Sequence, residues 1–232
     1  MMNLRNYFKI VFADERISDE KLAKFTEIHI QRLAANNSDG RYTKMIETTN
    51  AAYEAYFGAM TDEDTKFAVQ QSYTKAMNEV YEEFKKTISQ KEGTVRGIWN
   101  TDSPTYQEFF PLGVMDYTRC TLANVEMLMA RFINASRAHE KELGEAFINQ
   151  FTDIQTRFIS ARTAQLQKKG QVSESKDISG KRRIELEKQL TRNLLSLAVE
   201  YLGDEDRGMD FFDQSFIRKA VSEKEEEETK PE

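Results

Sequence analysis

Two histidines, His29 and His139, and one cysteine, Cys120, are the residues best suited to metal binding or nucleophilic chemistry. Helical bundles that bind two metal ions carry a Glu three positions before a ligating His, but Thr26 and Ser136 stand at those positions here. The cysteine has no CxxC partner, so we interpret it as helical filler. His29 falls on or beside an apolar stripe, and we interpret it as a core or rim histidine. The sequence therefore predicts no metal and no cofactor.

Two short motifs begin like metal-binding patterns but lack an essential ligand. The segment 139–143 (HEKEL) starts like the zinc-protease motif, yet Leu143 occupies the place of the second His. The segment 204–208 (DEDRG) starts like a calcium loop, yet its Gly comes one position early and Ser215 stands where a Glu is needed. Glycine-rich nucleotide loops, the Walker motif and the nucleophile elbow are missing from the sequence. These absences favour a non-catalytic protein, and an unrecognised enzyme stays the alternative.

Aromatic residues are concentrated in 93–117, a stretch that also holds two of the three prolines, the only tryptophan and three of the ten glycines. Ser103 and the proline after it predict a short helix over 104–110. Burying one large apolar side chain stabilises a fold by roughly 1.5–3 kcal/mol, so a connection of this kind is packed or functional. It either seals one end of a bundle or contacts a partner, and the residues expected to do so are Trp99, Phe109 and Phe110.

Two further sets of side chains could bind a ligand. A pocket between two halves of the bundle would be lined by residues that are not adjacent in the sequence, namely Tyr53, Tyr56, Tyr81 and Arg96. The range 157–192 carries ten Lys or Arg and four Asp or Glu, and a polar loop predicted over 170–180 would bring its basic ends together. Phosphate contact at this tip is a weaker alternative, through Lys168, Lys169, Lys181, Arg182 and Arg183.

Charge and composition limit the classes of partner and location. The chain of 232 residues has a net charge of −6, of which the acidic tail supplies −4, so the body has no strong field to attract polyanions. No aromatic residue lies between Lys168 and Arg192, where single-strand stacking would need one. One cysteine excludes an internal disulfide, and no run of 18 apolar residues predicts a membrane span. We expect a cytoplasmic protein with no membrane partner, and these observations disfavour a nucleic-acid partner without excluding one.

The elements that must position these residues are helices. Few prolines and abundant Ala, Leu, Glu, Lys, Gln and Arg favour helix, and apolar residues recur at spacings of three and four. Ser18 caps the first helix, a capping box at 61–64 starts the third, and Gly203 stops the last. An aromatic segment over 6–12 is expected to be extended and packed on the bundle. The predicted helices run over about 18–35, 42–60, 61–88, 122–161 and 181–202, and the fourth could be one helix or two.

These elements predict an all-α, up-and-down helical bundle of two pseudo-symmetric halves with about three helices each. Each half starts with an aromatic segment and ends in an Arg-Gly pair, which suggests an internal repeat. The expected division is 1–97 for the first half, 98–117 for an aromatic and proline-containing crossover, 118–221 for the second half and 222–232 for a disordered acidic tail.

Long apolar stripes, excess aromatic residues and the lack of catalytic motifs lead to one principal functional hypothesis. The protein is expected to be a non-catalytic interaction or scaffold protein that binds a protein partner or itself, with a homodimer as the expected state. The alternative is a small-ligand-binding protein or an unrecognised enzyme with a pocket between the two halves. The weaker alternative is nucleic-acid contact through the basic tip at 168–183.

Overall fold

The computed structural model describes residues 5, 8–14 and 16–217. Every regular element in that part of the chain is a helix, so the prediction of an all-α helical bundle is confirmed. The chain divides into two compact units. Unit 1 comprises Met1–Asp64 and Glu174–Glu232, and unit 2 comprises Thr65–Ser173. The predicted acidic tail at 222–232, and residues 6 and 7 of the predicted extended segment, lie outside the described residues.

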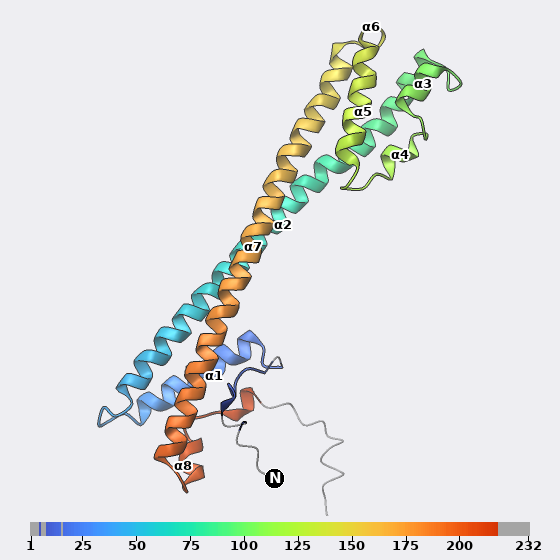
Figure 1. Ribbon diagram of the computed structural model, residues 1–232. Helices are drawn as coiled ribbons and strands as arrows, with labels where there is room; N and C mark the ends of the chain where they lie inside the picture. Colours follow the sequence, from blue (N-terminus) through green and yellow to red (C-terminus); the bar gives the residue numbers. More distant parts are fainter. Residues whose placement is uncertain (1–4, 6–7, 15, 218–232) are drawn as a thin grey trace, which may run out of the picture. The chain divides into compact units, whose positions relative to one another are not determined.

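Unit 1 is built from both ends of the described chain (Figure 1). Its elements are α1 (Asp19–Ala35), the first part of α2 (Thr43–Ile98), the last part of α7 (Glu145–Glu200), α8 (Glu205–Met209) and the 3-10 helix η2 (Gln214–Phe216). Ser18 caps α1 as predicted, because its hydroxyl oxygen accepts a hydrogen bond from the backbone N–H of Lys21 at 3.3 Å. Gly40, with a φ of +78°, turns the chain between α1 and α2.

The core of unit 1 is aromatic and aliphatic, and it draws on all the longer elements of the unit. Its buried members are Phe12, Ile17, Leu22, Phe25, Leu33, Tyr42, Tyr56, Leu186, Leu190, Leu197, Phe211 and Phe212. The Tyr42 hydroxyl contacts Glu200 Oε1 at 2.8 Å and the Tyr201 hydroxyl at 2.7 Å, which ties the start of α2 to the end of α7. The described part of the predicted extended segment, 8–12, is turn and not strand, and Phe12 is its anchor in the core.

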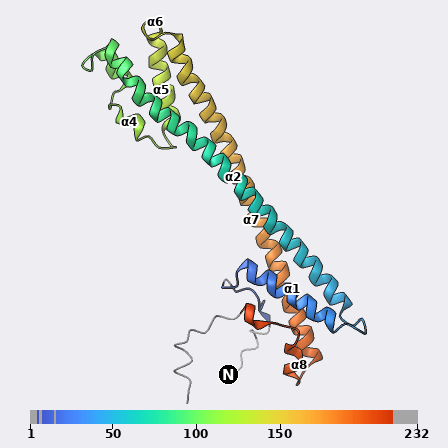
Figure 2. The same ribbon diagram turned by 180° about the vertical axis from the view of Figure 1, so that it is seen from behind.

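Unit 2 contains the rest of α2 and α7 together with α3 (Pro104–Phe109), α4 (Met115–Thr118), α5 (Val125–Ala138) and α6 (Glu140–Leu143) (Figure 2). The short helix predicted at 104–110 is α3, and its Ser103 cap accepts from the N–H of Tyr106 at 3.1 Å. Phe132 of α5 lies at the centre of a cluster of rings, with its centroid 4.5 Å from that of Phe151. The predicted apolar stripes of this part of the chain converge on this core.

Helix α2 runs without interruption through the position where the sequence predicted a helix boundary. The prediction that a capping box at 61–64 starts a helix is wrong, because α2 continues through these residues. The Thr61 hydroxyl instead donates to the backbone carbonyl of Phe57, one turn earlier in the same helix, at 3.0 Å. Gly58 lies in open space inside the helix, where it lowers helix propensity by about 1 kcal/mol without ending the helix.

Helix α7 likewise runs straight through the predicted polar loop at 170–180, so that prediction is wrong. The serines that suggested a loop are tied to α2 of the same unit: the Ser175 hydroxyl donates to Asp62 Oδ2 at 2.9 Å, and the Ser179 hydroxyl donates to Glu63. Val172 is also buried. These contacts with α2 outweigh the local turn preference of a Gly- and Ser-containing stretch, because tertiary packing supplies most helix stability.

The range 122–161 contains a break that the sequence left open. Helix α5 ends at Ala138, α6 is a single turn, and Gly144 with a φ of +81° starts α7 in a new direction. The compact units also differ from the predicted consecutive ranges 1–97 and 118–221, because α2 and α7 each contribute to both units. The internal repeat stays a prediction.

Candidate functional site

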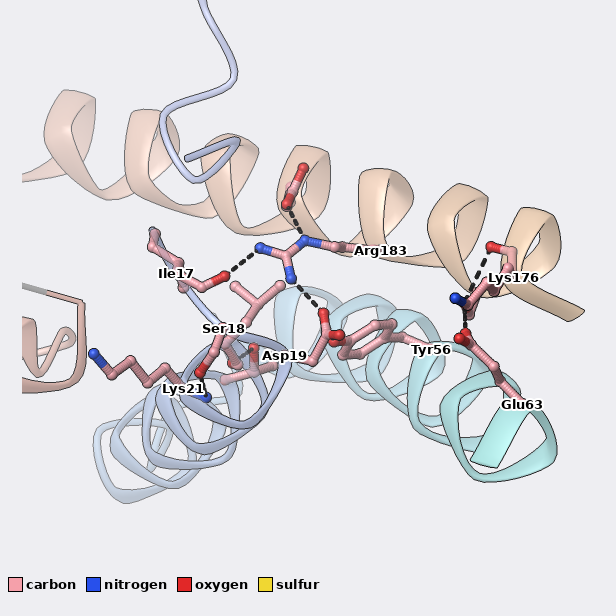
Figure 3. Close-up of polar contacts among 12 residues, drawn as sticks. Ile17, Ser18, Asp19, Lys21, Tyr56, Glu63, Lys176 and Arg183 are labelled. Carbon is pink, nitrogen blue, oxygen red and sulfur yellow. Dashed lines mark hydrogen bonds and ion pairs between the residues drawn. The ribbon is translucent and has the colours of Figure 1, made fainter. Parts of the chain in front are cut away.

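A densely connected polar cluster lies in unit 1, where the start of α1 meets α2 and α7 (Figure 3). Arg183 of α7 donates from Nε to Glu187 Oε1 at 2.8 Å and from Nη2 to the carbonyl of Ile17 at 2.6 Å. Its third nitrogen pairs with Asp19, the first residue of α1. The Tyr56 hydroxyl of α2 donates to the same Asp19 carboxylate at 2.7 Å. One guanidinium thus links three segments of unit 1.

The electrostatics of this cluster are those of a structural joint. Burial opposes the charge of Arg183, but the carboxylates of Glu187 and Asp19 outweigh it and raise the pKa of the guanidinium. Burial also raises the pKa of the Tyr56 hydroxyl, and its hydrogen bond to Asp19 raises the pKa further. Neither group can exchange a proton near neutral pH, so this part of the cluster is unsuited to general acid–base catalysis.

Two open depressions flank the Asp19–Arg183 pair. The larger, of about 530 Å³, is lined by Ala13, Asp14, Ile17, Ser18, Asp19, Arg183 and Glu187. The smaller, of about 300 Å³, is lined by Asp19, Tyr56, Met60, Glu63, Lys176, Ser179, Gly180 and Arg183. The charges of the larger depression are already paired, because Asp14 binds Arg16 and both other carboxylates bind Arg183. Across the described residues, His, Cys, Asp and Glu form no group of three or more that could hold a metal.

The four residues predicted to line a pocket each have another partner. Tyr53 donates to Glu27 at 2.7 Å, and burial raises the pKa of Tyr53 to about 12, helped by that bond. The hydroxyl of Tyr81 donates to the carbonyl of Cys120. Arg96 pairs with Glu92 at 3.7 Å. Tyr53 and Tyr56 belong to unit 1, whereas Tyr81 and Arg96 belong to unit 2.

The aromatic residues predicted as contact or end-sealing residues pack inside unit 2. Phe109 and Phe110 are buried, and Trp99 stacks on Phe109 with ring centroids 5.8 Å apart. His139 completes the group: its ring lies edge-on to Trp99 at 5.0 Å, and its Nε2 contacts Glu108 Oε2 at 2.8 Å. Of the two interpretations left open by the sequence, the burial of both phenylalanines favours sealing of the core.

The basic residues predicted to meet at a loop tip are spread along α7. Lys168 and Arg183 stand fifteen positions apart on this helix, which is about 22 Å at 1.5 Å per residue. The basic tip at 168–183 is therefore wrong as a structure. Lys168 Nζ lies 5.6 Å from the centroid of the Tyr73 ring, and the guanidinium of Arg183 is hydrogen-bonded within the polar cluster. Lys181 and Arg182 line an open surface depression with Ile178, Ile184, Glu185 and Lys188.

A surface that the sequence analysis missed lies on the side of α7 facing away from the core of unit 1. We call it the outer face of α7, and it consists of Lys181, Ile184, Lys188, Arg192, Leu195 and Val199, with Leu202 two positions after the end of the helix. The apolar members recur at helical spacing but out of phase with the core stripe of Leu186, Leu190 and Leu197. This second apolar stripe, offset from the core stripe, was the sequence pattern from which the outer face of α7 could have been predicted.

Comparisons with protein-family models, with curated proteins and with solved structures find no match to this chain. In the described part of the chain, no helix combines the length and apolar character required to cross a membrane.

Proposed function

We propose that this protein is a non-catalytic interaction protein that binds a protein partner through the outer face of α7. One observation carries the proposal, namely that this face exposes a row of large apolar side chains. Val199 and Leu202 are 78% and 89% exposed, and Ile184 and Leu195 are 45% and 41% exposed. Leu195, Val199 and Leu202 follow one another at helical spacing, and an exposed apolar patch of this kind commonly marks an interaction site.

Two depressions along the row offer space for side chains of a partner. Toward the C-terminal end of α7, an apolar groove of about 320 Å³ lies between α7 and α8 and includes Leu202, Met209 and Phe212. Farther back along α7, Phe8 lines a second depression with Leu195, and Phe8 is 90% exposed. Apolar anchors seated in small pockets supply most of the binding energy in protein interfaces.

The charges of the face indicate which partner it fits. Lys181, Lys188 and Arg192 lie along the same face, and Glu185 beside them pairs with Lys188 at 2.9 Å, which leaves the face with a net positive charge. Two copies of the face placed together would oppose cations to cations, which is unfavourable. A partner helix with apolar and acidic side chains is complementary to this face. The homodimer expected from the sequence stays a prediction, and it would need another surface.

The test replaces two apolar residues of the face by Asp, in the double variant Leu195→Asp/Val199→Asp. The wild-type chain, recovered from its own cells, is expected to elute in a complex larger than its 27.0 kDa mass, and the double variant at the mass of the free chain. The matched control is Met127→Asp, which alters an apolar side chain of unit 2 that is 63% exposed and should leave the complex intact.

Size measurement by light scattering on the purified wild-type chain shows whether the partner is a second copy. Both variants must give the same circular dichroism spectrum as the wild type, since loss of folding would mimic loss of binding. Equal elution of all three proteins, whether free or complexed, would overturn the proposal.

A further inference from the structure

One zone of unit 2 has basic side chains and no acidic ones. It comprises residues 65–78 of α2 and 154–173 of α7, which we call the acid-free zone. Its 14 and 20 residues contain six Lys or Arg and no Asp or Glu. The whole chain has 39 acidic residues in 232, so about six would be expected in a stretch of this size. A protein with a net charge of −6 thus carries a local excess of positive charge here.

The structure brings the two parts of the zone together in one unit. Lys168 of α7 lies over the ring of Tyr73 of α2, with Nζ 5.6 Å from the ring centroid. Carboxylates border the zone, and Arg157 pairs with Glu83 and with Asp153, each at 2.7 Å. The charge inside the zone therefore comes from residues other than Arg157.

Four cations of the zone have no carboxylate partner among the described residues: Lys75, Arg162, Lys168 and Lys169. Two of them are held by side-chain amides of the same helix. Arg162 Nη1 donates to Gln165 Oε1 at 2.9 Å, and Lys168 Nζ donates to Gln171 Oε1 at 3.1 Å. An amide orients a cation without cancelling its charge, so these groups keep their full attraction for an anion.

The remaining surface of the zone is also suited to phosphate. Its exposed polar residues are neutral hydrogen-bonding types, including Gln71, Ser72, Thr163 and Gln167. Two aromatic rings are partly open to solvent, since Phe67 is 47% exposed and Tyr73 is 38% exposed. Cations, neutral donors and exposed rings are the groups that contact the backbone and bases of nucleic acids.

We propose that the acid-free zone binds the phosphate backbone of a nucleic acid. The α7 part of the zone is about 30 Å long, which matches roughly nine base pairs at 3.4 Å each. The sequence argued against nucleic acid because no aromatic residue follows Lys168 as far as Arg192. In the folded unit, Tyr73 of α2 places an aromatic ring beside Lys168. The exposed apolar side chains of the zone, Val69, Ile159 and Leu166 with Phe67, are each less than half exposed and alternate along the helices with neutral polar residues.

The experiment measures binding of the full chain to a fluorescein-labelled 20-base-pair duplex and to a 20-nucleotide single strand by anisotropy, over a series of salt concentrations. Non-specific binding through four cations is expected in the range of about 10⁻⁴–10⁻⁶ M, with the logarithm of affinity falling against the logarithm of salt at a slope of about −3 to −4. The quadruple variant Lys75→Gln/Arg162→Gln/Lys168→Gln/Lys169→Gln should lose at least tenfold in affinity and most of this slope. Gln is a good helix former, so α2 and α7 should remain helical.

The matched control is the double variant Lys181→Gln/Lys188→Gln, which removes cations from the outer face of α7 in unit 1 and should bind as the wild type does. The proposal is overturned by absence of salt-dependent binding, or by equal losses in the quadruple and control variants. Preferential binding to vesicles containing phosphatidylserine, or to polyglutamate, overturns it in favour of a lipid or an acidic protein. None of these outcomes depends on the partner complex proposed for unit 1.

Discussion

At the residue scale, the buried polar side chains around His29 in unit 1 form a hydrogen-bond network in which the donors and acceptors can be assigned. The backbone carbonyl of Phe211 can only accept, so His29 carries its proton on Nδ1, which donates to that carbonyl at 2.9 Å. The other ring nitrogen accepts from Asn193 Nδ2 at 3.1 Å, and the same amide donates to Thr49 Oγ1 at 2.7 Å. Across the described residues, no buried side-chain nitrogen or oxygen lacks a hydrogen-bond partner.

This network makes His29 sensitive to acid. Burial lowers the pKa of His29 from 6.5 to about 4, against a smaller opposing effect of the hydrogen bond to Phe211. In the unfolded chain His29 becomes protonated below about pH 6.5, whereas in the folded chain it becomes protonated only near pH 4. The free energy of unfolding should therefore fall by about 3 kcal/mol from this group as the pH drops from 7 to 4. Urea unfolding at several pH values measures this fall.

The control for this prediction is His29→Gln, whose amide stays neutral throughout and can still donate and accept. The variant should start less stable than the wild type at pH 7 but lose less stability on acidification. Parallel pH curves for the two proteins would show that His29 does not titrate between the folded and unfolded states.

The sequence predicted several residue roles correctly where the signal was local. Ser18 and Ser103 are the caps expected of them, and His29 is the satisfied core histidine expected from its place on an apolar stripe. The Arg183 cluster could not be predicted, because it joins Arg183 to residues 17, 19 and 56, which only the fold brings together. Contacts between residues far apart in the sequence cannot be predicted from the residues that neighbour each of them along the chain.

At the element scale, the sequence predicted the ends of helices better than their continuity. Gly203, with a φ of +90°, ends the last helix where expected, and the turn at 36–40 separates α1 from α2. The predicted breaks at 58–61 and 170–180 were wrong, because Gly, Ser and Thr were given their local preference for turns. Pairing of α2 with α7 overrides that preference, and no local rule registers such pairing.

This continuity of α7 predicts that glycines in its interior weaken it. A Cβ atom added at Gly170 or Gly180 meets nothing within 4 Å, so Ala fits at both positions. Each Gly→Ala change should raise the free energy of unfolding by about 1 kcal/mol, because Ala has the higher helix propensity. Gly203→Ala is the opposing control and should destabilise by about 1–2 kcal/mol, since its positive φ is strained for any residue with a Cβ.

Denaturant unfolding of the three single variants measures these changes. A neutral or negative effect at both Gly170 and Gly180 would indicate that 170–180 forms a loop in solution, as the sequence suggested, and not a helix.

At the scale of the whole molecule, two separate hydrophobic cores share the same two long helices. One core centres on Phe25 and Leu190 in unit 1, and the other on Phe132 and Phe151 in unit 2. The division into units could not be read from the sequence, because it follows from which parts of α2 and α7 carry the additional helices and not from any linker.

The two cores predict that damage to one unit leaves the other folded. Phe132 packs against five aromatic rings, those of Phe109, Phe110, Tyr117, Phe147 and Phe151. Phe132→Ala should cost unit 2 about 3–5 kcal/mol, the usual cost of removing a buried ring. Amide hydrogen exchange followed by mass spectrometry should then quicken in α5 while α1 keeps the protection of the wild type.

The reciprocal variant Phe25→Ala should quicken exchange in α1 and leave α5 protected. The shared helices α2 and α7 provide the most sensitive test, because each should lose protection only in the part that belongs to the damaged unit. If either substitution speeds exchange equally in α1 and α5, the molecule unfolds as a single cooperative body. In that case α2 and α7 transmit stability along their full length, and the two cores are not independent.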